Sequence, residues 1–306
     1  MKKSLRAIFA FGCVSALLWA VFPLVSHAVQ EEEPPVFRTE VEVVNVICTV
    51  RKKNTYITDL RKEDFEVYED KVKQKIEYFG FESGEEAQSL NIVLLVDTSG
   101  SVKDKLRFEQ LAADAFLEET LRPNKDLAAV VQFDSEINLV QDFTYDLNTL
   151  GHSIEDIKAG GATKLYDAIF VSVDDLLRHE VGRKLLVVLS DGDDTQSLMK
   201  SEDAILVAQK HDVMIFGIGV QGKTSSDFGT LKKFSERTGG LFYNSKVSLE
   251  ELRKAFSAIN QAIKNQYSLG YVSSSLKRGV FREIKVKVKR RGLKVNHRRG
   301  YYSTGT

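Results

Sequence analysis

Long apolar runs alternate with amphipathic stretches through the middle of this sequence. The runs at 92–96, 184–189 and 213–218 are continuously apolar, which is typical of strands buried on both faces of a sheet. Segments 127–133 and 136–143 read as two further strands. Apolar residues recur at helical spacing in the remaining stretches, which are 105–121, 147–157, 164–178, 203–211, 227–237 and 249–264. This alternation predicts an α/β fold with a doubly wound, mostly parallel, Rossmann-like sheet over residues 90–264.

Both flanks of this region have the period of two that marks strands. A β-rich unit is expected over residues 36–83, and more strands are expected over 265–306. A piece of two or three strands is marginally stable alone. We therefore expect the two flanks to pack together as a small β-sandwich, with the α/β domain inserted in it or flanked by it.

The N-terminus has the features of an export signal. Lys2, Lys3 and Arg6 precede an apolar run over 7–25, and the small residues Ser26 and Ala28 occupy the two positions that a signal peptidase reads before it cleaves after Ala28. This pattern predicts a signal peptide over residues 1–28 and a secreted, periplasmic or cell-envelope protein. The alternative is an uncleaved anchor, because the run is about long enough to span a bilayer.

Loss of the leader changes the charge and the cysteine count. Three of the 43 basic residues lie in the leader and none of the 43 acidic ones, so the mature chain is weakly acidic. This balance argues against a specific nucleic-acid partner. Cys48 is then the sole cysteine, and its apolar surroundings predict a buried thiol without an intrachain disulfide.

Oxygen-bearing side chains follow the predicted strands in three loops. Asp97, Ser99 and Ser101 come after the first apolar run, Thr163 follows a Gly-Gly pair, and Asp191 ends the run at 184–189. Such loops meet at the carboxyl edge of a parallel sheet. Hard oxygen donors without histidine or cysteine favour Mg²⁺, Mn²⁺ or Ca²⁺ over zinc. The competing interpretation is structural, with Asp97 capping the next helix and the hydroxyls satisfying loop backbone.

The five residues as a set resemble the metal-ion-dependent adhesion site (MIDAS) of von Willebrand factor type A (VWA) domains. The resemblance implies that Ser99, Ser101 and Thr163 contact a metal, while Asp97 and Asp191 act largely through waters or hydrogen bonds. The chain is also similar to secreted VWA proteins described from Acidobacteria. The matching segments are 64–70, 163–168, 238–240, 266–271 and 300–302.

These features lead us to expect an extracytoplasmic, metal-dependent protein-binding or adhesion module without enzymatic activity. Neutral hydroxyl ligands leave a cation incompletely neutralised, so an Asp or Glu carboxylate of a partner protein is the expected final ligand. A structural envelope protein, in which the metal only braces loops, is the alternative within the same fold.

A rival function of another class rests on residues Gly217 to Thr224, which match the phosphate-loop pattern. This would make the protein a nucleotide-binding enzyme. The loop follows the third apolar strand rather than the first, and an exported chain is kept away from cytosolic ATP. Hydrolytic chemistry has no support either, because no serine lies in a Gly-x-Ser-x-Gly elbow.

Two groups of charges are open to more than one interpretation. The segment from Lys277 to Arg299 holds eleven basic residues and one acidic residue, Glu283. It is either a strand whose lysine face blocks edge-to-edge pairing or a patch for an anionic surface polymer. Near the predicted metal loops, we interpret Asp193 and Asp194 as solvated charges.

Overall fold

A computed structural model describes residues 43–84, 86–221, 228–275 and 277–303. The predicted signal peptide lies outside these described residues. No helix within the described ranges is long and apolar enough to cross a membrane.

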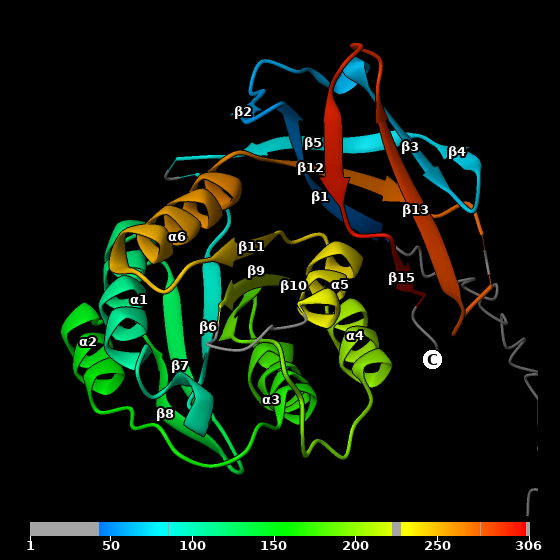
Figure 1. Cartoon of the computed structure of the whole chain (residues 1–306). Coiled ribbons are helices and arrows are strands. Elements are labelled where there is room, and N and C mark those ends of the chain that lie inside the picture. The colour runs from blue at the N-terminus through cyan, green and yellow to red at the C-terminus, as the bar shows by residue number, and fades with distance from the viewer. Residues whose placement is uncertain (1–42, 85, 222–227, 276, 304–306) are drawn as a thin grey trace, which may run out of the picture. The chain divides into compact units, whose positions relative to one another are not determined.

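The central sheet has six strands in the order β11-β10-β9-β6-β7-β8 (Figure 1). All neighbouring pairs are parallel except β7 and β8. The strand β11 was not expected from the sequence; it is four residues long and lies at the edge of the sheet. The strands are β6 (Leu90–Asp97), β7 (Leu127–Phe133), β8 (Ile137–Thr144), β9 (Arg183–Ser190), β10 (Val213–Val220) and β11 (Phe242–Ser245).

Helices cover both faces of this sheet because its strands are apolar on both sides. Ile92 and Leu94 of β6 pack in the core that contains residues of α1, α2 and α6, whereas Val93 and Leu95 pack in the core with residues of α3, α4 and α5. The helices are α1 (Leu106–Thr120), α2 (Leu147–Glu155), α3 (Leu165–Val171), α4 (Ser201–Lys210), α5 (Gly229–Thr238) and α6 (Leu249–Lys264).

The helix expected over 164–178 is only partly regular. It is α-helical in α3, continues as a π-helical segment over Ser172–Leu176 and ends as a 3-10 turn over Leu177–His179. Short 3-10 turns also precede β3, at Lys62–Asp64, and α1, at Gly100–Val102.

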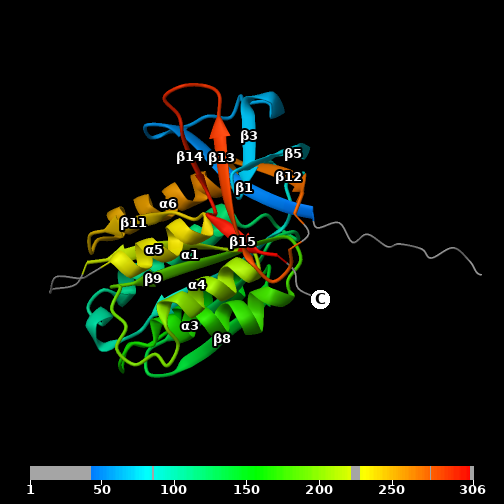
Figure 2. The same cartoon turned by 90° about the vertical axis from the view of Figure 1, so that its right-hand side faces the viewer.

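The flanking strands form two further sheets that share an apolar core (Figure 2). In the first, β1 pairs with β12, β14 and β2, and β12 also pairs with β5. In the second, β13 lies between β3 and β15, and β4 pairs with β3. The N-terminal strands are β1 (Val43–Lys52), β2 (Thr55–Tyr56), β3 (Phe65–Glu69), β4 (Val72–Gln74) and β5 (Ile76–Glu82). The C-terminal strands are β12 (Gln266–Val272), β13 (Phe281–Val288), β14 (Lys294–His297) and β15 (Gly300–Tyr302).

The expected fold class is therefore confirmed: strands from both ends of the chain pair beside the α/β sheet. Cys48 is buried in the sandwich core as a free thiol, as expected. Residues 41–306 form one compact unit.

The lysines of the basic segment lie on its exposed face, as expected. Lys285 and Lys287 of β13 face solvent, and their half of the strand pairs with β3, whereas β15 pairs with the other half, at residues 281–283. Both interpretations of the lysine face, edge protection and an anionic partner, stay predictions. Arg282 of the same strand is buried and pairs with the buried Glu69, with 3.1 Å between Nη1 and Oε1. One of the basic residues of this segment thus forms an ion pair inside the sandwich and does not contribute to a surface patch.

Candidate metal centre

Asp97 ends β6 and is completely buried. Its carboxylate accepts hydrogen bonds from the backbone N–H of Ser99 at 2.9 Å and from the hydroxyl of Ser190 at 2.6 Å. These bonds orient the carboxylate between β6 and the neighbouring strand β9. The pKa of Asp97 is raised to about 6, chiefly because the carboxyl group is buried. The nearby charge of Asp191 acts in the same direction, and the hydrogen bonds from Ser190 and Ser99 act against it.

A chain of hydroxyls links Asp97's loop to the loop after β9. Ser101 donates a hydrogen bond of 2.6 Å to Oδ2 of Asp191, and the hydroxyl oxygens of Ser99 and Ser101 lie 3.0 Å apart. Because the proton of Ser101 is directed at Asp191, Ser99 is the donor between the two serines. Ser99 and Asp191 are buried whereas Ser101 is exposed, so the chain runs from the interior to the surface.

Backbone hydrogen bonds join the second loop to the first. The N–H of Gly100 donates to the carbonyl of Gly161 at 3.0 Å, and the N–H of Gly160 donates to the carbonyl of Thr98 at 2.6 Å. Gly161 has a φ of +85°, and a Cβ there would lie 2.5 Å from the Ser135 hydroxyl oxygen. A residue with a side chain at this position would therefore clash with the turn after β7 and would need a left-handed backbone conformation.

Thr163 connects this loop to the third one. Its carbonyl accepts hydrogen bonds from the N–H groups of Thr195 and Gln196, at 2.9 and 3.0 Å, and its own N–H donates to the Thr195 hydroxyl at 3.0 Å. The three predicted loops are thus tied together at the carboxyl edge of the sheet. The backbone bonds place Thr163 at this edge, and hydroxyl bonds link Ser99, Ser101 and Asp191.

The donor set is consistent with a divalent cation. Oδ1 of Asp191 is buried and has no hydrogen-bond partner among the described residues. An orphaned carboxylate oxygen is costly unless something else pairs with it. No cluster of three His, Cys, Asp or Glu side chains occurs in the described part of the chain, and this site instead offers two carboxylates and three hydroxyls.

The sequence reading missed two buried charged groups beside this site. The ammonium of Lys105 lies 3.9 Å from Oδ2 of Asp191, and Glu109 is buried one turn further along α1. Lys105 and Glu109 are four residues apart, so the sequence places them on one face of the helix. The sequence does not show that this face is buried. Ser190, which orients Asp97, was also missed.

The acidic residues around the site have structural partners. Asp167, on α3, accepts hydrogen bonds from the backbone N–H groups of Leu198 and Met199 at 2.8 to 3.0 Å. Asp194 accepts a hydrogen bond of 2.6 Å from the hydroxyl of Ser197. The interpretation of Asp194 as a solvated charge is therefore wrong: it holds the loop after β9 in place.

A family model matches this arrangement of strands, helices and loops. The model of the von Willebrand factor type A domain matches residues 91–267, more than half of the chain. The chain belongs to the VWA domain family. The narrower likeness to acidobacterial secreted proteins stays a prediction.

Comparisons with individual proteins extend over parts of the VWA chain. An uncharacterised protein of Borreliella burgdorferi is 26% identical over 184 aligned residues, and the match covers 50% of this chain and 53% of that protein. The chain thus spans about half the length of this curated relative.

A solved structure from the mussel byssus has a similar fold. Proximal thread matrix protein 1 from the mussel byssus, with zinc in its MIDAS motif, has a TM-score of 0.52 and 16% identity, covering 61% of this chain and 48% of that one. BatB from Bacteroides thetaiotaomicron has a TM-score of 0.49 and 14% identity, covering 57% of this chain and 100% of that one.

Two glycines of the phosphate-loop pattern have a packing role in the VWA fold. Gly217 and Gly219 lie within β10, not in a loop. A Cβ on Gly217 would lie 2.7 Å from Cγ of Leu231, and one on Gly219 would lie 2.6 Å from Cδ1 of Phe228. The rest of the pattern, residues 222–224, lies outside the described residues.

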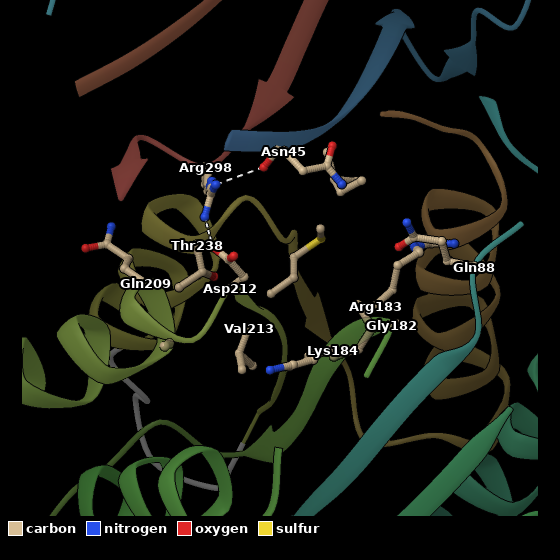
Figure 3. Close-up of a pocket in the computed structure, with 14 residues that line it drawn as sticks. Asn45, Gln88, Gly182, Arg183, Lys184, Gln209, Asp212, Val213, Thr238 and Arg298 are labelled. Carbon is tan, nitrogen blue, oxygen red and sulfur yellow. Dashed lines mark hydrogen bonds and ion pairs between the residues drawn. The ribbon is translucent and has the colours of Figure 1, made fainter. Parts of the chain in front are cut away.

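A cavity of about 130 Å³ lies at the opposite edge of the sheet, next to the sandwich (Figure 3). Its walls include Arg183 and Val213, where β9 and β10 begin. Arg298 pairs with Asp212 and donates to the carbonyl of Asn45 at 2.8 Å. This cavity is part of the joint between sandwich and VWA sheet, remote from the metal loops.

Proposed function

We propose that this VWA protein is an extracytoplasmic binding module without enzymatic activity. In this proposal Asp97, Ser99, Ser101, Thr163 and Asp191 would hold a divalent cation, which would supply the positive charge for a carboxylate of a partner protein. The proposal is carried by the buried Oδ1 of Asp191, which has no hydrogen-bond partner in the described ranges and lies beside the linked hydroxyls of Ser99 and Ser101.

Each residue has a defined part in this mechanism. Asp97, oriented by Ser190 and the Ser99 backbone, supplies negative charge from the interior. Asp191 supplies the second carboxylate, and the exposed Ser101 marks the side from which a partner approaches. When bound, the cation supplies a positive centre for an incoming Asp or Glu side chain.

The metal series should start with Mg²⁺, Mn²⁺ and Ca²⁺, which prefer oxygen ligands. Zinc belongs in the series as well, because the mussel protein of the same fold holds it in a MIDAS motif. The site residues here include no nitrogen or sulfur donor, so we expect the hard cations to bind in preference to zinc.

The first experiment is calorimetric titration of the mature chain, residues 29–306, with each metal. We expect saturable binding of the metal, and we expect Asp97→Ala to abolish it. The control is Asp114→Ala, which removes a carboxylate of α1 outside the proposed site and should leave metal binding intact. Absence of metal binding in the wild type would overturn the proposal. Partner binding should then disappear in chelator and in Ser99→Ala.

The two alternatives give different results in the same experiments. A VWA domain in which the metal only braces loops would lose thermal stability in chelator but keep its partner. A nucleotide-binding enzyme would bind ATP, and Lys223→Ala would remove that binding. N-terminal sequencing of the exported protein, with residue 29 as the expected first residue, tests the extracytoplasmic location.

A further inference from the structure

Lys105 is a buried cation beside the carboxylates of the proposed site. It directly precedes α1, and its side chain is 5% exposed. Its ammonium donates to the carbonyl of Val220 at the end of β10, at 3.3 Å, and lies 3.9 Å from Oδ2 of Asp191. A buried ammonium is costly unless negative charge compensates for it.

The ion pair of Lys105 is with Asp191 rather than with Glu109, which lies one turn further along α1. Neither carboxyl oxygen of Glu109 has a hydrogen-bond partner within the described chain, and the side chain is buried. Burial raises the pKa of Glu109 to about 8, so this group carries a proton at neutral pH. The carboxylate that pairs with Lys105 is therefore that of Asp191.

The formal charges of this cluster determine whether the metal-loaded site carries a net positive charge. Asp97 and Asp191 together could neutralise a divalent cation completely, and a partner carboxylate would then add excess negative charge. With the ammonium of Lys105 present, one positive charge remains after a cation binds. A single carboxylate from outside would balance it.

We propose that Lys105 is a tethered counter-ion that weakens metal binding by itself and strengthens capture of a carboxylate by the metal-loaded protein. This inference rests on the proposed function, because it concerns the same site. Lys105 acts through Asp191 and the charge of the cluster, so it is a positioning residue and not a ligand. Its effect makes the metal-loaded protein bind more tightly when a partner carboxylate is present.

The test compares metal and carboxylate affinities in the mature chain. Mn²⁺ is titrated alone and then in the presence of acetate as the carboxylate probe. In Lys105→Gln, which keeps a donor for the Val220 carbonyl but removes the charge, we expect Mn²⁺ to bind about tenfold more tightly or better. The same variant should bind acetate more weakly once loaded with Mn²⁺.

Two matched variants isolate the buried charge. Lys105→Arg retains the charge and should behave like the wild type in both titrations. Lys103→Met removes an exposed lysine two residues earlier, and solvent screening should leave both affinities nearly unchanged. Opposite changes in the two affinities are a signature that a merely structural role would not produce.

The outcomes separate this inference from the function on which it rests. If Mn²⁺ binds wild type and Lys105→Gln equally, or if both affinities fall together, Lys105 only braces the start of α1 and the inference is wrong. If neither protein binds any metal, the proposed function fails and the inference fails with it.

Discussion

Ser101 donates a hydrogen bond of 2.6 Å to Asp191, although the two residues are 90 positions apart in the chain. The bond joins the loop after β6 to the loop after β9, because these strands are parallel neighbours and end at the same edge. It also shows how the site is held without a cation: a hydroxyl proton partly compensates one carboxylate.

Removal of the Ser101 hydroxyl should affect metal binding more than folding. In Ser101→Ala we expect the Mn²⁺ affinity to fall by about tenfold or more, as is typical when a group at a metal site is lost. The free energy of unfolding in chelator should fall by about 1–2 kcal/mol, because Asp191 loses a charge-assisted hydrogen bond. Calorimetry and urea unfolding measure the two effects. Ser101→Thr keeps the hydroxyl and should restore both.

Metal affinity should fall in acid because of Asp97. Burial raises the pKa of this carboxyl to about 6, so protons compete with a cation below that pH. We expect a nearly constant Mn²⁺ affinity above pH 7 and a loss approaching about tenfold per pH unit well below pH 6. Titrations across this range measure it. A flat profile down to pH 4.5 would mean that Asp97 does not need to ionise for binding.

Glu109→Gln should stabilise the protein without metal at neutral and alkaline pH. The folded-state pKa of Glu109 is raised from 4.5 to about 8, so between these values the unfolded state is the more ionised one. Wild-type stability therefore falls as the pH rises through this window, at up to about 1.4 kcal/mol per pH unit. Below pH 4.5 this contribution is absent, and above pH 8 it is constant.

Urea unfolding of wild type and Glu109→Gln at several pH values measures this difference. The gap should open between pH 4.5 and 8 and stay constant at higher pH. A gap that is independent of pH would contradict a neutral, buried Glu109.

Glu69→Ala should destabilise the sandwich strongly. Glu69 pairs with Arg282 and also accepts hydrogen bonds from the hydroxyls of Tyr271 and Tyr301, at 2.7 and 3.0 Å. Its removal leaves the guanidinium of Arg282 buried without a carboxylate, which costs about 3–5 kcal/mol. Urea unfolding measures the loss, and Glu66→Gln, which breaks the surface pair with Lys73, is the control with no measurable change expected. Equal stability of both variants would show that the buried pair contributes nothing net.

Metal affinity offers a second check on this variant. The Glu69 network lies in the sandwich, whereas the metal loops lie at the carboxyl edge of the VWA sheet. Folded Glu69→Ala should therefore bind Mn²⁺ with the wild-type affinity.

The fold class and the set of candidate ligands could both be predicted from the order of residues in the chain. Strands such as 92–96 are apolar on both faces, so they fit only inside a sheet covered by helices on both sides. The order of those strands then placed the loops of Asp97, Thr163 and Asp191 at one edge. Period-two patterning likewise identified the flanking strands, although β11 and β14, at four residues each, were too short to stand out.

Which charges are buried, and which groups they face, follows from the packing of the folded chain. Arg282 and the exposed lysines of β13 look alike in the sequence, but the face on which each lies depends on how β13 packs over the sandwich core. Similarly, Lys105 and Glu109 could have faced solvent; the contact of α1 with the sheet brings them beside Asp191. Long-range packing sets the dielectric environment and the partners of a charged group, and these determine whether it is a surface charge or part of a binding site.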